Sequence, residues 1–244
     1  MSNFVGIIPA RYASSRFPGK PLAIIKGISM IQRVYEQAKK VEEFNEVIVA
    51  TDNTAIFKHV ENFGGKAVMT SETHQSGTDR CFEAYQSVPS KNSDDIIINI
   101  QGDEPFIDPE QIKKVISIFE DDKVEIGTLV KKIDDNKELN DKNIVKVIVS
   151  HSKKALWFSR AAIPFIRNEK KEEWLKHFTF YKHIGLYGYR ASVLKKIVAM
   201  PQSKHETAES LEQLRWLDND INIYAAETNT DSKGIDTYED LINL

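Results

Sequence analysis

The chain has 244 residues, of which 41% are hydrophobic and 28% are charged, and these values are typical of a globular protein with a sizeable core. Its formal net charge is −3, so no general basic field favours nucleic acid, and any anion site must be a local cluster. Cys81 is the only cysteine, which excludes an intrachain disulfide and a zinc site made of cysteines.

The first half alternates short apolar runs with helical patterns. Strands are predicted at 4–8, 47–50, 67–69 and 96–100, and helices after Ser29, at 55–63, at 79–88 and from Glu110. Ser29 and Gln32 form a capping-box pattern, which indicates a helix start. The apolar stripe of the helix that follows is Met30, Ile31, Val34, Ala38 and Val41. This alternation predicts an α/β fold with a mostly parallel sheet and helices on both faces.

The second half changes character. Alternating valines before a turn predict a hairpin over 144–158, and the charged stretch 167–177 is typical of a solvated excursion. A strand is expected at 184–189, a helix at 206–217, a last strand at 221–226 and a short helix at 236–244. With no repeat and no linker, residues 1–244 are predicted to form one domain with a smaller, mixed-topology portion.

Polar loops follow the predicted strands, and ligands of open α/β sheets bind beyond the carboxyl ends of the strands. Arg11, Arg16 and Lys20 follow the first strand, Asp52 the second and Asp103 the fourth. A cationic loop with exposed backbone and hydroxyl groups suits phosphate, although it is not a P-loop. A solvated turn with incidental charges is the alternative.

Two aspartates are candidate metal ligands. Asp103 directly follows a buried strand and suits Mg²⁺ bridging to phosphate. The alternative is that Asp103 is a turn residue or caps the next helix, but Asp108-Pro109 already supplies that cap. Asp236 is either a second ligand or the cap of the terminal helix.

The loop 74–80 leads into a helix. Ser76 and the Gly77 backbone could hydrogen-bond a base edge, or Thr78 could cap the helix. His183 is isolated, and a lone histidine is more often structural. Cys81 lies in an apolar helical pattern, which indicates a buried thiol.

Several functional classes are excluded by missing patterns. The six histidines show no zinc-hydrolase spacing, and no nucleophile-elbow motif is present. No apolar stretch approaches the roughly 20 residues of a membrane span, and no signal peptide is recognisable. We therefore expect a cytoplasmic protein that neither inserts into membranes nor binds nucleic acid.

A set of motifs in one order covers nearly the whole chain and closely resembles the 3-deoxy-manno-octulosonate cytidylyltransferase (CMP-Kdo synthetase) family. The motifs are IIPARYASSRFPGKPL, VIVATD, HQSGTDR, INIQGDEPFI, WFSRAAIPF, HIGLYGYR, ESLEQLRWL and GIDTYEDL. The first is shared with sialic acid cytidylyltransferases, whereas QGDEP with HIGLYGYR and EQLR is more specific to the Kdo branch. Tyr238 stands where that family commonly has proline.

The resemblance implies a Rossmann-like nucleotidyltransferase fold and transfer of CMP from CTP to Kdo with Mg²⁺. Residues 1–130 would bind CTP, 131–200 would form a β-rich sugar-binding and dimerisation portion, and 201–244 would return to the main sheet. By motif, Arg11, Arg16, Lys20 and Asp103 would be catalytic, and Asp103 and Asp236 would hold the metal. The nucleotide would contact Pro9, Ala10, Arg11, Arg16, Lys20, Ser76, Gly77, Arg80 and Gln101. The sugar acid would contact Gln101, Arg160, His183, Tyr187, Glu212 and Gln213.

Alternatives to this assignment remain open. The sugar could be 8-amino-Kdo, since Glu212 could pair with an ammonium as well as accept from hydroxyls. A sialic or pseudaminic acid is a further alternative. A non-catalytic sugar-nucleotide sensor or an assembly partner is the alternative from another class. The family resemblance and the apolar hairpin also lead us to expect a homodimer.

Overall fold

A nine-stranded sheet runs through the computed structural model, which describes residues 3–13, 17–89, 91–231 and 234–242. Seven strands lie in one row and a hairpin extends the sheet at one side. The row contains β1 (Phe4–Ala10), β4 (Phe44–Thr51), β5 (Ala67–Met69), β6 (Ile96–Asn99), β7 (Ile126–Lys132), β10 (Tyr181–Arg190) and β11 (Ile223–Glu227). The hairpin is β8 (Lys146–Val149) with β9 (Ala155–Ser159), and β2 (Ile24–Ile25) with β3 (Ile28–Ser29) form a separate small sheet.

The sheet is mostly parallel, as the sequence predicts. Its order is β11-β7-β10-β6-β1-β4-β5, and only β10 in this described row runs antiparallel to its neighbours β6 and β7. The predicted strands and the hairpin are all confirmed within a few residues. The sequence analysis predicted no strand at β7, which lies between β10 and β11.

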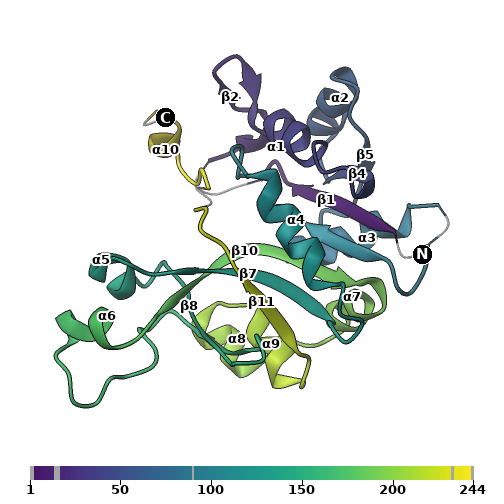
Figure 1. The fold of residues 1–244 in the computed structure, drawn as a ribbon. Coiled ribbons are helices and arrows are strands. Elements are labelled where there is room, and N and C mark those ends of the chain that lie inside the picture. Colours follow the sequence, from purple (N-terminus) through teal and green to yellow (C-terminus); the bar gives the residue numbers. More distant parts are fainter. Residues whose placement is uncertain (1–2, 14–16, 90, 232–233, 243–244) are drawn as a thin grey trace.

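Helices cover both faces of the sheet (Figure 1). One face packs against α1 (Met30–Ala38), α2 (Thr54–Asn62) and α4 (Pro109–Ile118). The other packs against α3 (Gly77–Gln86), α7 (Ala191–Val198) and α9 (Gln213–Asp218). The remaining helices are α5 (Asn136–Asn140), α6 (Trp174–His177), α8 (Lys204–Glu209), α10 (Tyr238–Ile242) and the 3₁₀ turns η1 (Lys20–Leu22) and η2 (Lys171–Glu173).

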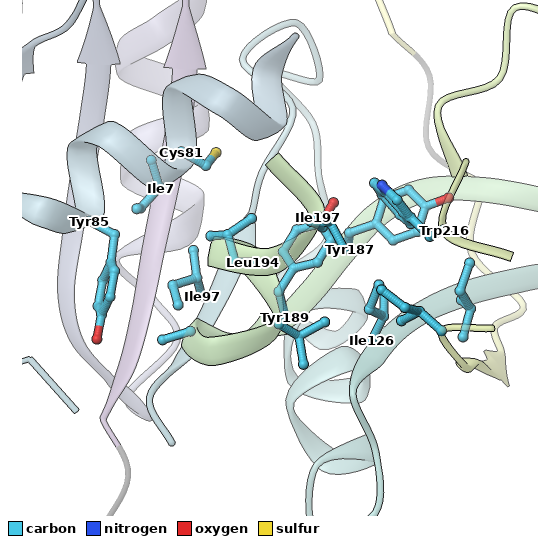
Figure 2. Close-up of a cluster of buried hydrophobic side chains, with 14 of the residues drawn as sticks. Ile7, Cys81, Tyr85, Ile97, Ile126, Tyr187, Tyr189, Leu194, Ile197 and Trp216 are labelled. Atoms are coloured by element: carbon cyan, nitrogen blue, oxygen red, sulfur yellow. The ribbon is translucent and has the colours of Figure 1, made fainter. Parts of the chain in front are cut away.

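The core on the α3 side joins the two halves of the chain (Figure 2). Ile7 and Ile97 of the central strands pack with Tyr189 of β10 and Trp216 of α9, all at most 1% exposed. Cys81 belongs to the same cluster, and burial raises the pKa of its thiol well above the ordinary value. The prediction of a buried thiol is confirmed.

Three local predictions need correction. Residues 206–217 do not form one helix, because Ser210 adopts a left-handed conformation (φ 51°) that separates α8 from α9. The stretch 167–177 is not wholly solvated, since Trp174 is 4% exposed and stacks on Phe180. Ser29 does cap α1, whereas the Gln32 side chain donates to Glu36 rather than completing a capping box.

The C-terminal segment crosses back from β11 to the first half of the chain and ends near β2 (Figure 1). The backbone N–H of Ile235 donates to the carbonyl of Asp103 (2.9 Å), and the Ile235 side chain packs with Ile25 and Met30. This anchor brings residue 236 beside the loop that follows β6.

Two glycines of β10 differ in the space around them. A Cβ atom on Gly188 would lie 2.6 Å from Phe119 Cε2 and 2.9 Å from Ile98 Cδ1, whereas a Cβ atom on Gly185 would meet nothing within 4 Å. Both of these neighbours of Gly188 are buried, so neither can move without disturbing the core.

We therefore expect Gly188→Ala to lower the free energy of unfolding by about 1–3 kcal/mol, the usual cost of overpacking. Gly185→Ala on the same strand is the matched control and should change it little. Urea unfolding measures both, and equal stability of the two variants would contradict this account of the packing.

Candidate active site

A cavity of about 280 Å³ opens beyond the carboxyl ends of β1 and β6. Its walls come from the loop after β1, the start of α3, the loop after β6 and the C-terminal segment. The lining residues are Pro9, Ala10, Arg11, Lys20, Pro21, His74, Gln75, Ser76, Gly77, Arg80, Gln101, Gly102, Asp103 and Asp236. The strand-end rule thus located the cavity correctly, and it brings together every nucleotide and metal candidate except Arg16, which lies outside the described residues.

Lys20 is held between two carboxylates in this cavity. Its ammonium Nζ lies 2.7 Å from Asp103 Oδ2 and 3.3 Å from Asp236 Oδ1. The Lys20 side chain is 14% exposed, whereas those of Asp103 and Asp236 are 33% and 50% exposed. The two carboxylates would repel each other without a cation between them, so a positive charge at the position of the Lys20 ammonium stabilises this arrangement.

Asp236 does not cap α10. Thr237 Oγ1 accepts from the backbone N–H of Asp240, and the Asp240 carboxylate accepts from the backbone N–H groups of Asp236 and Thr237. The helix is therefore capped by Thr237 and Asp240, and the alternative explanation of Asp236 is wrong.

Gly102 allows the loop after β6 to approach β1 closely. A Cβ atom at this position would lie only 2.7 Å from the backbone oxygen of Pro9, which cannot move aside as a side chain can. A glycine between Gln101 and Asp103 is thus required for both side chains to reach the cavity.

Ser76, not Thr78, caps α3. Ser76 Oγ accepts from the backbone N–H of Asp79 (3.1 Å), and the Asp79 carboxylate accepts from the backbone N–H of Ser76 (3.2 Å). Ser76 still lines the cavity. Ser76 can therefore cap α3 and contact a ligand in the cavity at the same time.

Arg80 lines the cavity but is already paired. Its guanidinium donates to Thr70 Oγ1 and to Asp52 Oδ2, both at 2.6 Å, and the residue is 4% exposed. Asp52 is thereby used as the partner of Arg80. The structure gives Arg80 a role in fixing the cavity wall beside the predicted role in nucleotide binding.

Of the residues predicted to contact the sugar acid, only Gln101 and Glu212 line a cavity. Gln101 lines the cavity and donates to the carbonyl of Gly185 (2.9 Å), and Glu212 lines a neighbouring cavity of about 610 Å³. The two cavities share Gln75 and Ser76. The four other candidates, Arg160, His183, Tyr187 and Gln213, are not among the lining residues of either cavity.

Arg160 is engaged by the backbone. Its guanidinium donates to the carbonyl oxygens of Glu209 (2.7 Å), Lys142 (3.1 Å) and Ser210 (3.3 Å). In this structure the arginine predicted to contact the sugar acid therefore holds the turn between α8 and α9.

Tyr187 and Gln213 are buried, and His183 is half-buried. Burial lowers the pKa of His183 to about 3, so its imidazole is neutral, and Nε2 lies 3.0 Å from Thr128 Oγ1. The hydroxyl of Tyr187 has no hydrogen-bond partner among the described residues, although the side chain is 7% exposed. Gln213 is 6% exposed.

Sequence reasoning did not select His74, Gln75, Pro21 and Gly102 as lining residues. His74 Nε2 donates a hydrogen bond to the Glu83 carboxylate, and this contact helps to fix the loop before α3. All four lie within the quoted motifs, so their position next to selected residues was the available signal.

A second set of possible metal ligands lies in the charged stretch 167–177. Glu169, Glu173 and His177 have ligand atoms within 4.8 Å of one another. His177 already pairs with Glu169 (3.4 Å) and Glu173 with Lys176 (2.9 Å). These partly exposed ion pairs account for the group without a metal.

Comparisons with known proteins identify the family to which this chain is similar. A family model described as cytidylyltransferase matches residues 5–225, which defines the class of the protein. A 3-deoxy-manno-octulosonate cytidylyltransferase of Parabacteroides distasonis is 55% identical over 245 residues, covering 99% of this chain and 96% of the relative. An 8-amino-3,8-dideoxy-manno-octulosonate cytidylyltransferase of Shewanella pealeana is 44% identical over 241 residues, covering 98% and 96%.

A solved structure is also similar over its whole length. It is a CMP:2-keto-3-deoxy-manno-octonic acid synthetase complexed with CTP, with a TM-score of 0.92, 42% identity, and coverage of 99% of this chain and 96% of that one. The chain belongs to the 3-deoxy-manno-octulosonate cytidylyltransferase family. This confirms the resemblance and makes the protein a nucleotidyltransferase. No helix in the described part of the chain is long and apolar enough to cross a membrane.

Proposed function

We propose that the protein transfers CMP from CTP to the anomeric hydroxyl of 3-deoxy-D-manno-octulosonate, giving CMP-Kdo and pyrophosphate for lipopolysaccharide biosynthesis. The observation that carries this proposal is the Lys20 ammonium between Asp103 and Asp236, in a cavity at the carboxyl ends of parallel strands. The family membership supports the choice of substrates.

The reaction needs positioning and charge neutralisation more than covalent catalysis. The sugar hydroxyl would attack the α-phosphorus in line, and pyrophosphate would leave. Arg11 is exposed at the cavity and Lys20 is within it, so both can bind the triphosphate and stabilise charge on the leaving group. Arg16 belongs to the same proposal through its motif.

The donor set of the cavity fits Mg²⁺. Asp103 and Asp236 offer hard carboxylate oxygens within reach of one cation, the Lys20 ammonium, so both can face a single positive centre. When bound, the ion would neutralise charge on the phosphate oxygens. Lys20 would then be released from the two carboxylates to contact the triphosphate.

The base and sugar would occupy adjoining cavities. Ser76, Gly77 and the backbone around them would contact the cytosine, and the sugar acid would lie toward Glu212 in the second cavity. Arg160, His183, Tyr187 and Gln213 are proposed sugar ligands through their motifs alone. Gln101 lines the nucleotide cavity on the side of β10.

Kdo is favoured over its 8-amino analogue because relatives named for Kdo reach 55% identity, against 44% for the relative named for 8-amino-Kdo. Since nucleoside triphosphates are made in the cytoplasm, we expect the activity there.

We also propose a homodimer. Leu156 of β9 and Phe165 are 56% and 73% exposed, and exposed apolar groups of this size favour an interface. A mass of two chains in light scattering at micromolar concentration is the expected result, and a single-chain mass would contradict the proposal.

Pyrophosphate release tests the function directly. With CTP and Mg²⁺, we expect release with Kdo, and a lower kcat/KM with 8-amino-Kdo and with sialic acid. UTP in place of CTP should be used poorly, because the loop at Ser76 would contact the base edge. Release with 8-amino-Kdo alone would change the assigned sugar but not the reaction, and binding of CTP without release with any sugar acid would favour a sensor.

Asp103→Asn and Asp236→Asn remove one charge each while keeping the side-chain shape. We expect each to lower kcat by at least about a hundredfold, the scale of losing one well-placed electrostatic group. Asp108→Asn is the control, since Asp108 caps α4 outside the cavity. Near-normal kcat in both cavity variants would refute the proposed metal ligands.

A further inference from the structure

The two cavities are separated by the start of α3. The nucleotide cavity of about 280 Å³ and the second cavity of about 610 Å³ have Gln75 and Ser76 in common. The far wall of the second cavity comes from α8 and α9, which include Glu206 and Arg215. Whatever moves the start of α3 therefore changes both cavities.

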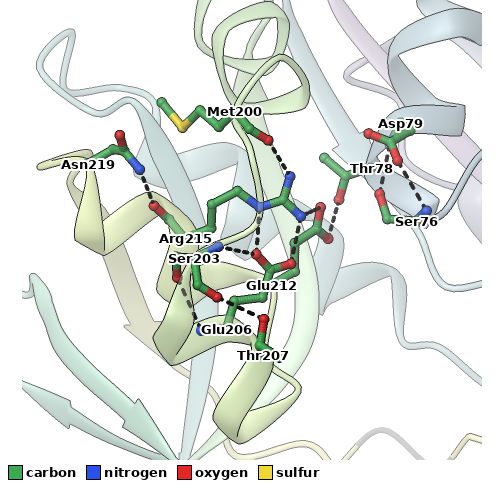
Figure 3. Close-up of polar contacts among 10 residues, drawn as sticks. All are labelled: Ser76, Thr78, Asp79, Met200, Ser203, Glu206, Thr207, Glu212, Arg215 and Asn219. Atoms are coloured by element: carbon green, nitrogen blue, oxygen red, sulfur yellow. Dashed lines mark hydrogen bonds and ion pairs between the residues drawn. The ribbon is translucent and has the colours of Figure 1, made fainter.

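An arginine clamp holds α8 and α9 together (Figure 3). Arg215 Nε and Nη2 donate to the two carboxylate oxygens of Glu206 at 2.8 and 2.6 Å, and Nη1 donates to the carbonyl of Met200 at 3.0 Å. Glu206 and Arg215 are 6% and 8% exposed. A buried bidentate pair of this kind fixes the geometry of the two short helices relative to each other.

Glu212 connects this unit to α3. Its Oε2 accepts a hydrogen bond of 2.8 Å from Thr78 Oγ1, and its Oε1 lies 3.8 Å from Arg215 Nη2. Thr78 is 3% exposed and is the second residue of α3. Burial raises the pKa of Glu212, while the hydroxyls of Thr78 and Ser76 and the charge of Arg215 act in the opposite direction.

The bond between Thr78 and Glu212 joins positions 134 residues apart. On one side, Thr78 lies between Ser76 and Asp79, the two residues of the capping box, so its hydroxyl belongs to the same turn as the wall of the nucleotide cavity. On the other side, Glu212 lines the second cavity. Figure 3 shows the series of contacts from Thr78 through Glu212 to Arg215, with the capping box of Ser76 and Asp79 beside it.

We propose that Thr78 is a positioning residue that couples the binding of the two substrates through its hydrogen bond to Glu212. This inference rests on the proposed function for the identity of the ligands. A sugar acid that contacts Glu212 orders the carboxylate that holds the start of α3, and CTP orders the same segment from the other side. The second ligand to bind then meets a wall that is already ordered, which gives positive and reciprocal coupling.

A purely structural role of Thr78 makes a different prediction. Loss of a buried hydroxyl that donates to a carboxylate lowers stability whether or not the two sites communicate. Stability alone therefore cannot distinguish the two roles, whereas the ratio of CTP affinities with and without the sugar can.

Isothermal titration of a CTP analogue with a methylene group between the α- and β-phosphorus, which blocks transfer, measures that ratio. We expect saturating Kdo to tighten binding of the analogue to the wild type by about fivefold or more, the lower end of typical allosteric coupling. In Thr78→Val, which keeps the shape but lacks the donor, the ratio should fall below about twofold. Thr78→Ser is the matched control and should retain the wild-type ratio.

Wild-type coupling in Thr78→Val, or no coupling in the wild type, would overturn the proposal. If the valine variant does not fold, Thr78→Ala removes the same donor without the valine methyl groups. Pyrophosphate release by the wild type is measured in parallel with the sugar used in the titration. Its absence would contradict the proposed function, and its presence together with unchanged coupling in Thr78→Val would contradict this inference alone.

Discussion

The arrangement of the site depends on one ammonium group between two carboxylates. Lys20, Asp103 and Asp236 come from three segments separated by 83 and 133 positions, and two close carboxylates are stable only when a cation lies between them. Two of these segments have an anchor of their own. Gly102 lets the loop after β6 pass under Pro9, and the backbone bond from Ile235 to Asp103 holds the C-terminal segment in place.

The antiparallel strand β10 serves a second purpose in the sheet. It lies between β6 and β7, so the second half of the chain is hydrogen-bonded directly to the strand that carries the Gln101–Asp103 loop. The shared core around Tyr189 and Trp216 then fixes α9 against α3. This packing and the hydrogen bond from Thr78 to Glu212 connect the walls of the two cavities.

The parts of the fold that depend on local patterns were predicted from the sequence. Buried strands such as β6 and the apolar stripe of α1 have strong periodicity, and the strand-end rule placed Asp103 and Lys20 at one cavity. Features that depend on tertiary contacts were not predicted. Ser210 breaks a helical pattern without glycine or proline, and Trp174 is buried inside a charged stretch. Arg160 was selected by resemblance, and its engagement by three backbone carbonyls depends on the fold around it.

A crystal structure with a non-transferable CTP analogue and Mg²⁺ tests the central claim most directly. The account predicts the triphosphate in the 280 Å³ cavity, the ion on the carboxylates of Asp103 and Asp236, and Lys20 moved from them to a phosphate oxygen. The same complex with Lys20 still between both carboxylates, and the nucleotide or the ion bound elsewhere, would contradict it.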